Sequence, residues 1–260
     1  MIIERTIEAV LILAAIRAGI RLLARKRAVT SEELNLEKEL RGLATAKRLP
    51  IATLVLLVLL TIGALAEVIW PGTLNVLRND PSNPDWWRPL TAPFVQDDGV
   101  IGAIFNLVTA AAVMALAEWY WGGLLALGIW AIGAWAPIGA VAALAGYRAA
   151  AANTDAYTAG SSGATYFTAA TLCAALLCAG TGRDRLIGLV GPVIGLASWL
   201  GLGDGHGLLF TAGVIVGVAL WVIVRLTGRL SRGSGAGKVN PRAPTSSTGG
   251  GSDRERSSGQ

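Results

Sequence analysis

Two side chains could together attack a carbonyl group: the hydroxyl of Ser162, in the stretch GSSGATYF at residues 160–167, and the imidazole of His206. A serine hydroxyl is a weak nucleophile unless a neighbouring base takes its proton, and histidine is the usual base because it titrates near neutral pH. His206 is the only histidine among 260 residues, so one imidazole is available. Taken alone, it is explained more simply as a loop histidine that begins a helix and hydrogen-bonds to water.

Glycines favour a close approach between the segments that carry these two residues. Gly213 and Gly217 follow His206 by seven and eleven residues, which is close to two and three helical turns, so all three share one helical face. Small residues on that face let a second membrane helix pack tightly, and Gly163 would open the facing surface beside Ser162. Ordinary packing explains the glycines equally well, but it does not explain a serine and a histidine at matched depth.

Two further polar residues are candidates for the same site. Asn106 lies within the apolar run GAIFNLVTAAAV, where an amide costs free energy unless it is hydrogen-bonded, so we expect it to point inward. Its NH2 group could donate to the oxyanion that forms when a serine attacks a carbonyl, or it could simply bond to another helix. Asp204 could act as a triad acid, but its neighbours Gly203 and Gly205 favour a turn or helix N-cap residue.

Composition places these residues in a membrane protein. Hydrophobic residues make up 53% of the chain and charged residues 15%, against about 25% charged in soluble domains. Most lysines and arginines precede residue 49 or follow residue 224, so the net charge of +5 indicates basic cytoplasmic ends beside anionic lipid and gives no reason to expect a nucleic-acid partner. Cys173 and Cys178 lie in an apolar run at a spacing that suits neither a metal nor a disulfide, and no cofactor is expected.

The apolar runs predict an all-α membrane protein with six spans and three regions. Residues 1–49 should form N-terminal cytoplasmic or interfacial helices, because Arg17, Arg21 and Arg25 share one face of an amphipathic helix over 5–27; a short additional span is the alternative. Residues 229–260 should be a disordered basic tail. The membrane domain, 50–228, contains runs at about 50–69, 99–117, 122–146, 161–180, 185–202 and 206–226.

The basic residues predict which side of the cell membrane each connection faces. Arg183 and Arg185 lie between the fourth and fifth runs, and other basic residues precede the first run and follow the last. This pattern predicts a multi-pass protein of the cell membrane with both termini in the cytoplasm. Ser162 and His206 then both begin their spans on the outer side, and the long loop 70–98 lies on that side too.

Several motifs, in this order, resemble those of rhomboid intramembrane serine proteases. GSSG at 160–163 resembles the rhomboid GxSG motif, and WWRPLTAPFVQDDGVIGAIFN at 86–106 resembles the rhomboid stretch that ends in HxxxN. Glu118 with Gly122 is similar to the end of the second rhomboid helix. His206, Gly213 and Gly217 resemble the last-helix pattern H-x-x-G-x-x-x-G-x-x-x-G, so the resemblance covers about residues 50–226.

The resemblance implies a fold, an activity and a set of site residues. The fold would be the rhomboid six-helix bundle, and the activity would be cleavage of transmembrane segments of membrane proteins by a serine–histidine dyad without cofactor or metal. Ser162 would be the nucleophile and His206 the base, while Asn106 and the Ser162 backbone N–H would bind the oxyanion. Gly160 and Gly163 would flank the nucleophile, Tyr166 would pack against the imidazole, and loop 70–98 would be anchored at the membrane interface by Trp86, Trp87 and Arg88.

Two departures from the family pattern leave alternatives open. Gly102 stands where the HxxxN histidine is expected, so one oxyanion donor is missing, and Leu209 stands where the last helix has its first glycine. A shifted register would put Phe210 at the histidine position and make the protein inactive. The alternatives are therefore a catalytically inactive rhomboid-like protein that binds membrane proteins, and a small transporter or channel, for which the membrane runs offer almost no charged residues.

Overall fold

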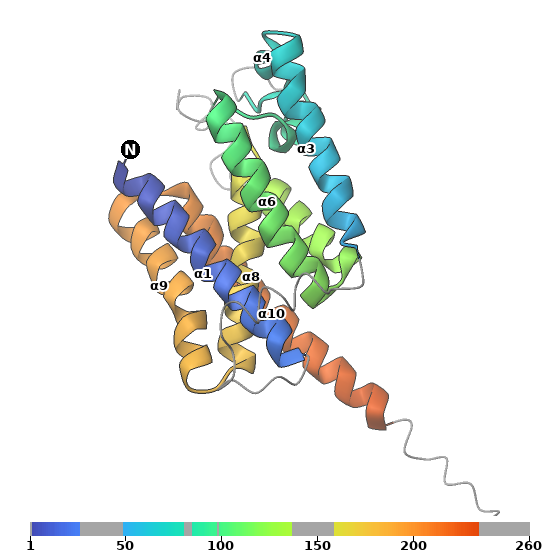
Figure 1. Ribbon diagram of the computed structural model, residues 1–260, viewed down its shortest axis with the longest axis vertical. Helices are drawn as coiled ribbons and strands as arrows, with labels where there is room; N and C mark the ends of the chain where they lie inside the picture. The colour runs from blue at the N-terminus through green and yellow to red at the C-terminus, as the bar shows by residue number, and fades with distance from the viewer. Residues whose placement is uncertain (1, 27–48, 81–84, 98, 137–158, 234–260) are drawn as a thin grey trace, which may run out of the picture. The chain divides into compact units, whose positions relative to one another are not determined.

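The computed structural model describes residues 2–26, 49–80, 85–97, 99–136 and 159–233 (Figure 1). Almost all of this part of the chain is helical. It divides into two compact units, residues 1–222 and 223–260, and the candidate site lies within the first. Residues 27–48 of the predicted N-terminal region and residues 234–260 of the predicted tail lie outside the described residues.

Five helices in the described part are long and apolar enough to cross a membrane. A shorter apolar helix, Gly123–Ala136, covers the start of the run predicted at 122–146, whose remainder lies outside the described residues. The protein is therefore an all-α protein with several candidate membrane spans, as its composition predicts. The five long helices are α3 (Ile51–Ile69), α6 (Gly99–Trp121), α8 (Ser162–Ala179), α9 (Arg183–Leu202) and α10 (Gly205–Gly233).

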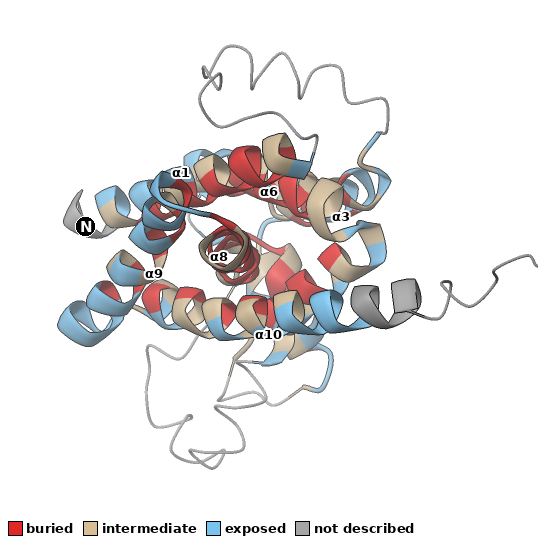
Figure 2. Cartoon of the chain, turned by 90° about the horizontal axis from the view of Figure 1, so that it is seen from below, coloured by how far each residue is buried: buried red, intermediate tan, exposed pale blue. Residues whose placement is uncertain are grey.

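Helix α8, which begins at Ser162, is the most buried of these helices. It packs against α6 and α9, and Figure 2 shows its buried residues surrounded by neighbouring helices. Three buried threonines on α8 place polar groups in this core, but each hydroxyl donates to a carbonyl of its own helix within four residues and is therefore satisfied. They are Thr165, Thr168 and Thr171.

Helix α10 approaches α8 closely through the two glycines that the sequence analysis singled out. A Cβ on Gly217 would lie 2.7 Å from Cα of Thr171, and a Cβ on Gly213 would lie 2.9 Å from Cβ of Ala170. Phe210, on the same helix, is fully buried against glycines of α9. The glycine face of α10 therefore serves the tight helix packing expected of it.

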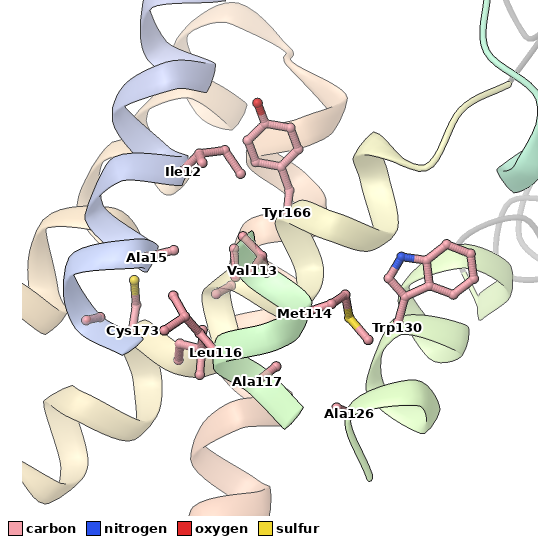
Figure 3. Packing of buried hydrophobic residues seen from close by; sticks show 14 of the residues in the cluster. Ile12, Ala15, Val113, Met114, Leu116, Ala117, Ala126, Trp130, Tyr166 and Cys173 are labelled. Atoms are coloured by element: carbon pink, nitrogen blue, oxygen red, sulfur yellow. The ribbon is translucent and has the colours of Figure 1, made fainter. Parts of the chain in front are cut away.

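The first helix, α1 (Ile2–Lys26), differs from the expected surface helix. It packs against α6, α8 and α9, and its buried apolar residues belong to the main hydrophobic core (Figure 3). Its basic residues are paired within the bundle, because Arg21 and Arg25 both form ion pairs with Asp184 at the start of α9. Its arginine-bearing face is partly buried, because a carboxylate is there to receive it.

The two ends of α1 lie at opposite ends of the bundle. Arg25 contacts Asp184 where α9 begins, whereas Glu8 contacts His206 where α10 begins. The helix therefore runs along the bundle and does not lie across one of its ends, and the cytoplasmic position expected for the N-terminus stays a prediction.

The loop between α3 and α6 is organised by a buried arginine. It contains α4 (Thr73–Leu77), α5 (Arg88–Thr91) and the short 3-10 helix η2 (Ala92–Phe94). Arg88 is buried and donates to the carbonyl of Asn75 at 2.8 Å and to the carboxylate of Asp85 at 3.1 Å. Trp86 and Trp87 are exposed, as an interfacial role requires, but Arg88 holds the loop together from within.

Candidate functional site

The nucleophile candidate sits at the first turn of α8. Gly160 precedes it with φ +101°, a backbone conformation that side chains rarely adopt, and its N–H donates to the carbonyl of Ala92 in η2 at 2.9 Å. This bond ties the turn before α8 to the loop described above. Ser162 is partly exposed, whereas its neighbour Ser161 is fully buried, so only the hydroxyl of Ser162 faces accessible space.

The structure brings Ser162 and His206 into hydrogen-bond contact. The distance between Nε2 of His206 and Oγ of Ser162 is 3.0 Å, and the two residues come from different helices, 44 positions apart. This value lies within the range of roughly 2.6–3.2 Å expected for a nucleophile and its base. The register that would place Phe210 at the base position is not adopted, because Phe210 is buried against α9.

Two carboxylates face the other nitrogen of the same imidazole. Oε1 of Glu8 lies 3.1 Å from Nδ1, and Oδ1 of Asp204 lies 3.5 Å from it. Glu8 is buried, and its other oxygen pairs with Arg5 at 3.3 Å. The sequence analysis considered Asp204 but not Glu8, which lies 198 positions before His206 in the sequence.

Asp204 also caps the helix that carries the imidazole. Its carboxylate accepts the backbone N–H groups of His206 and Gly207 at 3.1 and 3.0 Å and the hydroxyl of Ser198 at 2.8 Å. This agrees with the N-cap interpretation and fixes the start of α10 relative to α9. The hydrogen bonds from His206 and Ser198 hold the pKa of Asp204 well below its usual range, although partial burial opposes them.

Tyr166 lies beside the imidazole, where the rhomboid resemblance expects it. The centroids of its ring and the His206 ring are 4.8 Å apart, and the planes are tilted by 49°. Tyr166 is one helical turn after Ser162 on α8, and Figure 3 shows its ring on the side of α8 that faces Ile12 of α1. The ring therefore packs against the imidazole and restricts its rotation.

Asn106 points inward and bonds to a residue that the sequence analysis did not single out. Its Nδ2 donates to Oε1 of Gln96 at 2.7 Å, and both side chains are buried. A Cβ built on Gly160 would lie 3.4 Å from Oε1 of Gln96, 3.8 Å from Nδ2 of Asn106 and 3.9 Å from Oγ of Ser162. Both amides therefore lie beside the nucleophile, and only glycine at 160 leaves the space between them open.

The departure at Leu209 is accommodated by the glycine next to the nucleophile. A Cβ on Gly163 would lie 2.7 Å from Cδ1 of Leu209, so the leucine occupies the space above this glycine. The larger residue does not displace His206 from Ser162, since their contact is intact.

The site contains no arrangement for a metal: the described residues hold no group of three or more histidine, cysteine or acidic side chains that could bind one. What the arrangement can do is acyl transfer, because it combines a hydroxyl, an imidazole, carboxylates behind the imidazole and amides beside the hydroxyl. Comparisons with protein-family models, with curated proteins and with solved structures found no match to this chain.

Proposed function

We propose that this protein is an intramembrane serine protease of the rhomboid type, which cleaves transmembrane segments of other membrane proteins. One observation carries the proposal above all others: the only imidazole in the chain meets the hydroxyl of Ser162 at 3.0 Å, from two helices that a membrane would enclose. The resemblance of the ordered motifs to rhomboid proteases supports it, as does the packing of Tyr166 against His206.

The geometry supports a two-step reaction. Oγ of Ser162 attacks a backbone carbonyl of the substrate while Nε2 of His206 takes the hydroxyl proton, and a tetrahedral oxyanion forms. When the C–N bond breaks, the imidazolium gives this proton to the leaving amine and an acyl-enzyme remains. Water then attacks the acyl carbonyl and transfers a proton to His206, which returns it to Oγ as the carboxylic acid product leaves.

The membrane setting determines the class of substrate. The helices around Ser162 are apolar on their outer faces, as a lipid environment requires, so a transmembrane segment can approach the site from within the bilayer. A helical peptide bond is protected by its own hydrogen bonds, so the segment must unwind before Ser162 can attack it. The proposed substrates are therefore transmembrane proteins, and lipid is the medium in which they meet the enzyme.

Covalent labelling with a fluorophosphonate tests the proposal. The reagent forms an O–P bond at an activated serine with loss of fluoride, and it needs a base for the hydroxyl proton. Wild type should be labelled, whereas Ser162→Ala and His206→Ala should each lose labelling almost completely, because residues that act as one unit cost about as much singly as together. Ser161→Ala is the matched control, since it removes the adjacent buried serine and should label like wild type.

Cleavage of a purified single-span substrate in lipid vesicles provides the second measurement. The same three variants should rank as they do in labelling. Wild-type protein that is neither labelled nor active, in detergent and in vesicles alike, would refute the protease proposal and favour the inactive rhomboid-like protein that binds membrane segments.

A further inference from the structure

The helix α1 supplies a charged group to the candidate site. Glu8 is buried, yet its carboxylate has no position in the dyad described above. Its oxygen Oε2 pairs with Arg5 at 3.3 Å, and its other oxygen, Oε1, lies 3.1 Å from Nδ1 of His206. The opposite ring nitrogen of His206 faces Ser162.

We propose that Glu8 is a positioning residue that converts the serine–histidine pair into a triad. This inference rests on the proposed function. A carboxylate at Nδ1 keeps the ring proton on that nitrogen, so that Nε2 is left free to accept the proton of Ser162. It also stabilises the imidazolium that forms during attack. Arg5 holds the second oxygen and thereby fixes the direction of the first.

The groups around the imidazole determine its behaviour with pH. They are Glu8 and Arg5 from α1, Asp204 before α10, and Tyr166 and Ser162 from α8. Glu8 is nearer to Nδ1 than Asp204 is, and Asp204 already receives three other hydrogen bonds. Glu8 therefore has the better geometry for the positioning role, and Asp204 has the role of helix cap.

The experiment compares Glu8→Gln with Arg25→Gln in the full-length protein. Arg25 lies on the same helix at the far end, where it pairs with Asp184, so its loss weakens the docking of α1 without touching the site. Glu8→Gln should slow fluorophosphonate labelling by about 10²-fold, less than the roughly 10⁴-fold cost of altering the sole carboxylate of a triad, because Asp204 remains. The acid limb of its pH–rate profile should move to lower pH, since a negative charge favours the protonated ring. Arg25→Gln should leave the acid limb at its wild-type position.

Nuclear magnetic resonance provides a measurement that needs no turnover. Because the chain has one histidine, ¹⁵N-histidine labelling reports on His206 alone. In wild type the neutral ring should carry its proton on Nδ1, and Glu8→Gln should shift the population toward the other tautomer, whereas Glu8→Asp should partly restore the wild-type spectrum. An unchanged tautomer and an unchanged acid limb in Glu8→Gln would overturn the inference, even if Ser162 is labelled normally. Equal slowing in Glu8→Gln and Arg25→Gln with unmoved acid limbs would also overturn it, because Glu8 would then only dock α1.

A separate observation concerns the oxyanion. Gln96 is 6% exposed, and its Nε2 has no hydrogen-bond partner among the described residues. A buried amide without a partner costs about 1–3 kcal/mol, so such a group in a folded protein calls for a function. Oε1 of the same amide lies 3.4 Å from a Cβ built on Gly160, just before the first turn of α8, where helix geometry leaves backbone N–H groups without acceptors.

The geometry points to Gln96 as a second oxyanion donor beside Asn106, in place of the histidine that is absent at Gly102. This inference also rests on the proposed function. The bond between the two amides uses one N–H, whichever way they are oriented, so the pair keeps an NH2 group for the oxyanion of the intermediate. Gly160 leaves open a space that is bordered by Oε1 of Gln96, Nδ2 of Asn106 and Oγ of Ser162, and Nε2 belongs to the same amide as that Oε1.

Kinetics of Gln96→Glu and Gln96→Ala test this role. When it is ionised, the glutamate keeps an acceptor for Asn106 but has no donors, whereas the alanine removes both. Both should lower kcat by about 10²-fold with little change in KM, as loss of one oxyanion donor does. Two variants that keep kcat within about threefold of wild type would overturn the assignment while leaving Ser162 and His206 in their proposed roles. A rise in KM of about 10²-fold with unchanged kcat would overturn it too, because Gln96 would then stabilise the bound substrate as much as the intermediate.

Discussion

The close approach of α8 and α10 at Gly217 predicts that one added methyl group will damage the fold and the site together. In Gly217→Ala the new Cβ would lie 2.7 Å from Cα of Thr171 and 2.8 Å from Cβ of Ala174. Carbon atoms in good contact are about 3.5–4.0 Å apart, so the two helices must separate by about 1 Å. Overpacking of this kind costs about 1–3 kcal/mol, and the roughly 1 kcal/mol that alanine gains over glycine in a helix offsets only part of it.

The control and the measurement follow from the same geometry. Gly201, near the end of α9, has no atom within 4 Å of an added Cβ among the described residues, so Gly201→Ala should be as stable as wild type or slightly more stable. Thermal unfolding of the purified variants in detergent compares the two. Gly217→Ala should unfold at a lower temperature and label more slowly at Ser162, because α10 carries His206 and moves as one helix. Equal stability of the two glycine variants would refute the helix-contact argument.

Three further predictions concern other contacts of the bundle. Glu118→Gln should lower the free energy of unfolding by about 1–3 kcal/mol, as measured by thermal unfolding, because that carboxylate accepts the backbone N–H groups of Ala52 and Thr53 at the start of α3 and the Thr53 hydroxyl. Gly163→Ala should slow labelling of Ser162, because the added methyl group pushes Leu209 aside. Adding Leu209→Ala should recover most of the labelling rate, whereas additive losses in the double variant would exclude a shared contact. Asp204 has a lowered pKa in the folded protein, so its contribution to stability is fully present above its ordinary pKa of about 3.9 and is lost only as pH falls through the folded value. Asp204→Asn should therefore be less stable than wild type at pH 7, and the difference in unfolding temperature should shrink steadily as pH falls below about 4.

The features that were predictable from sequence are those that depend on composition and local spacing. Apolar runs near 20 residues long correspond to α3, α6, α8, α9 and α10, since length and hydropathy alone determine which segments suit a membrane. The contact between Ser162 and His206 was also predictable, because both residues begin predicted spans on the same side and glycines at helical spacing allow the helices to approach closely. Gln96 was missed because it lies in an irregular loop, where no periodicity shows which way a side chain points.

The sequence of α1 contains the pattern that explains why this helix packs inside the bundle. Glu8, Leu11, Ala15, Ala18 and Leu22 recur at alternating intervals of three and four residues, so they share one face, and Arg25 continues the series. The structure buries this face between other helices, and the charged residue at each end meets an opposite charge or an imidazole there.

The seven charged residues of α1 led to the prediction of a surface position, because an unpaired charge inside the membrane costs free energy. That cost depends on partners which are not visible in the helix itself. Asp184 receives Arg21 and Arg25, and His206 receives Glu8, so the helix becomes tolerable at this depth only once it is docked. The same dependence means that the carboxylate at the candidate site and the docking of α1 are linked. A protein that loses α1 from the bundle should lose the proposed triad with it, even though Ser162 and His206 remain in the chain.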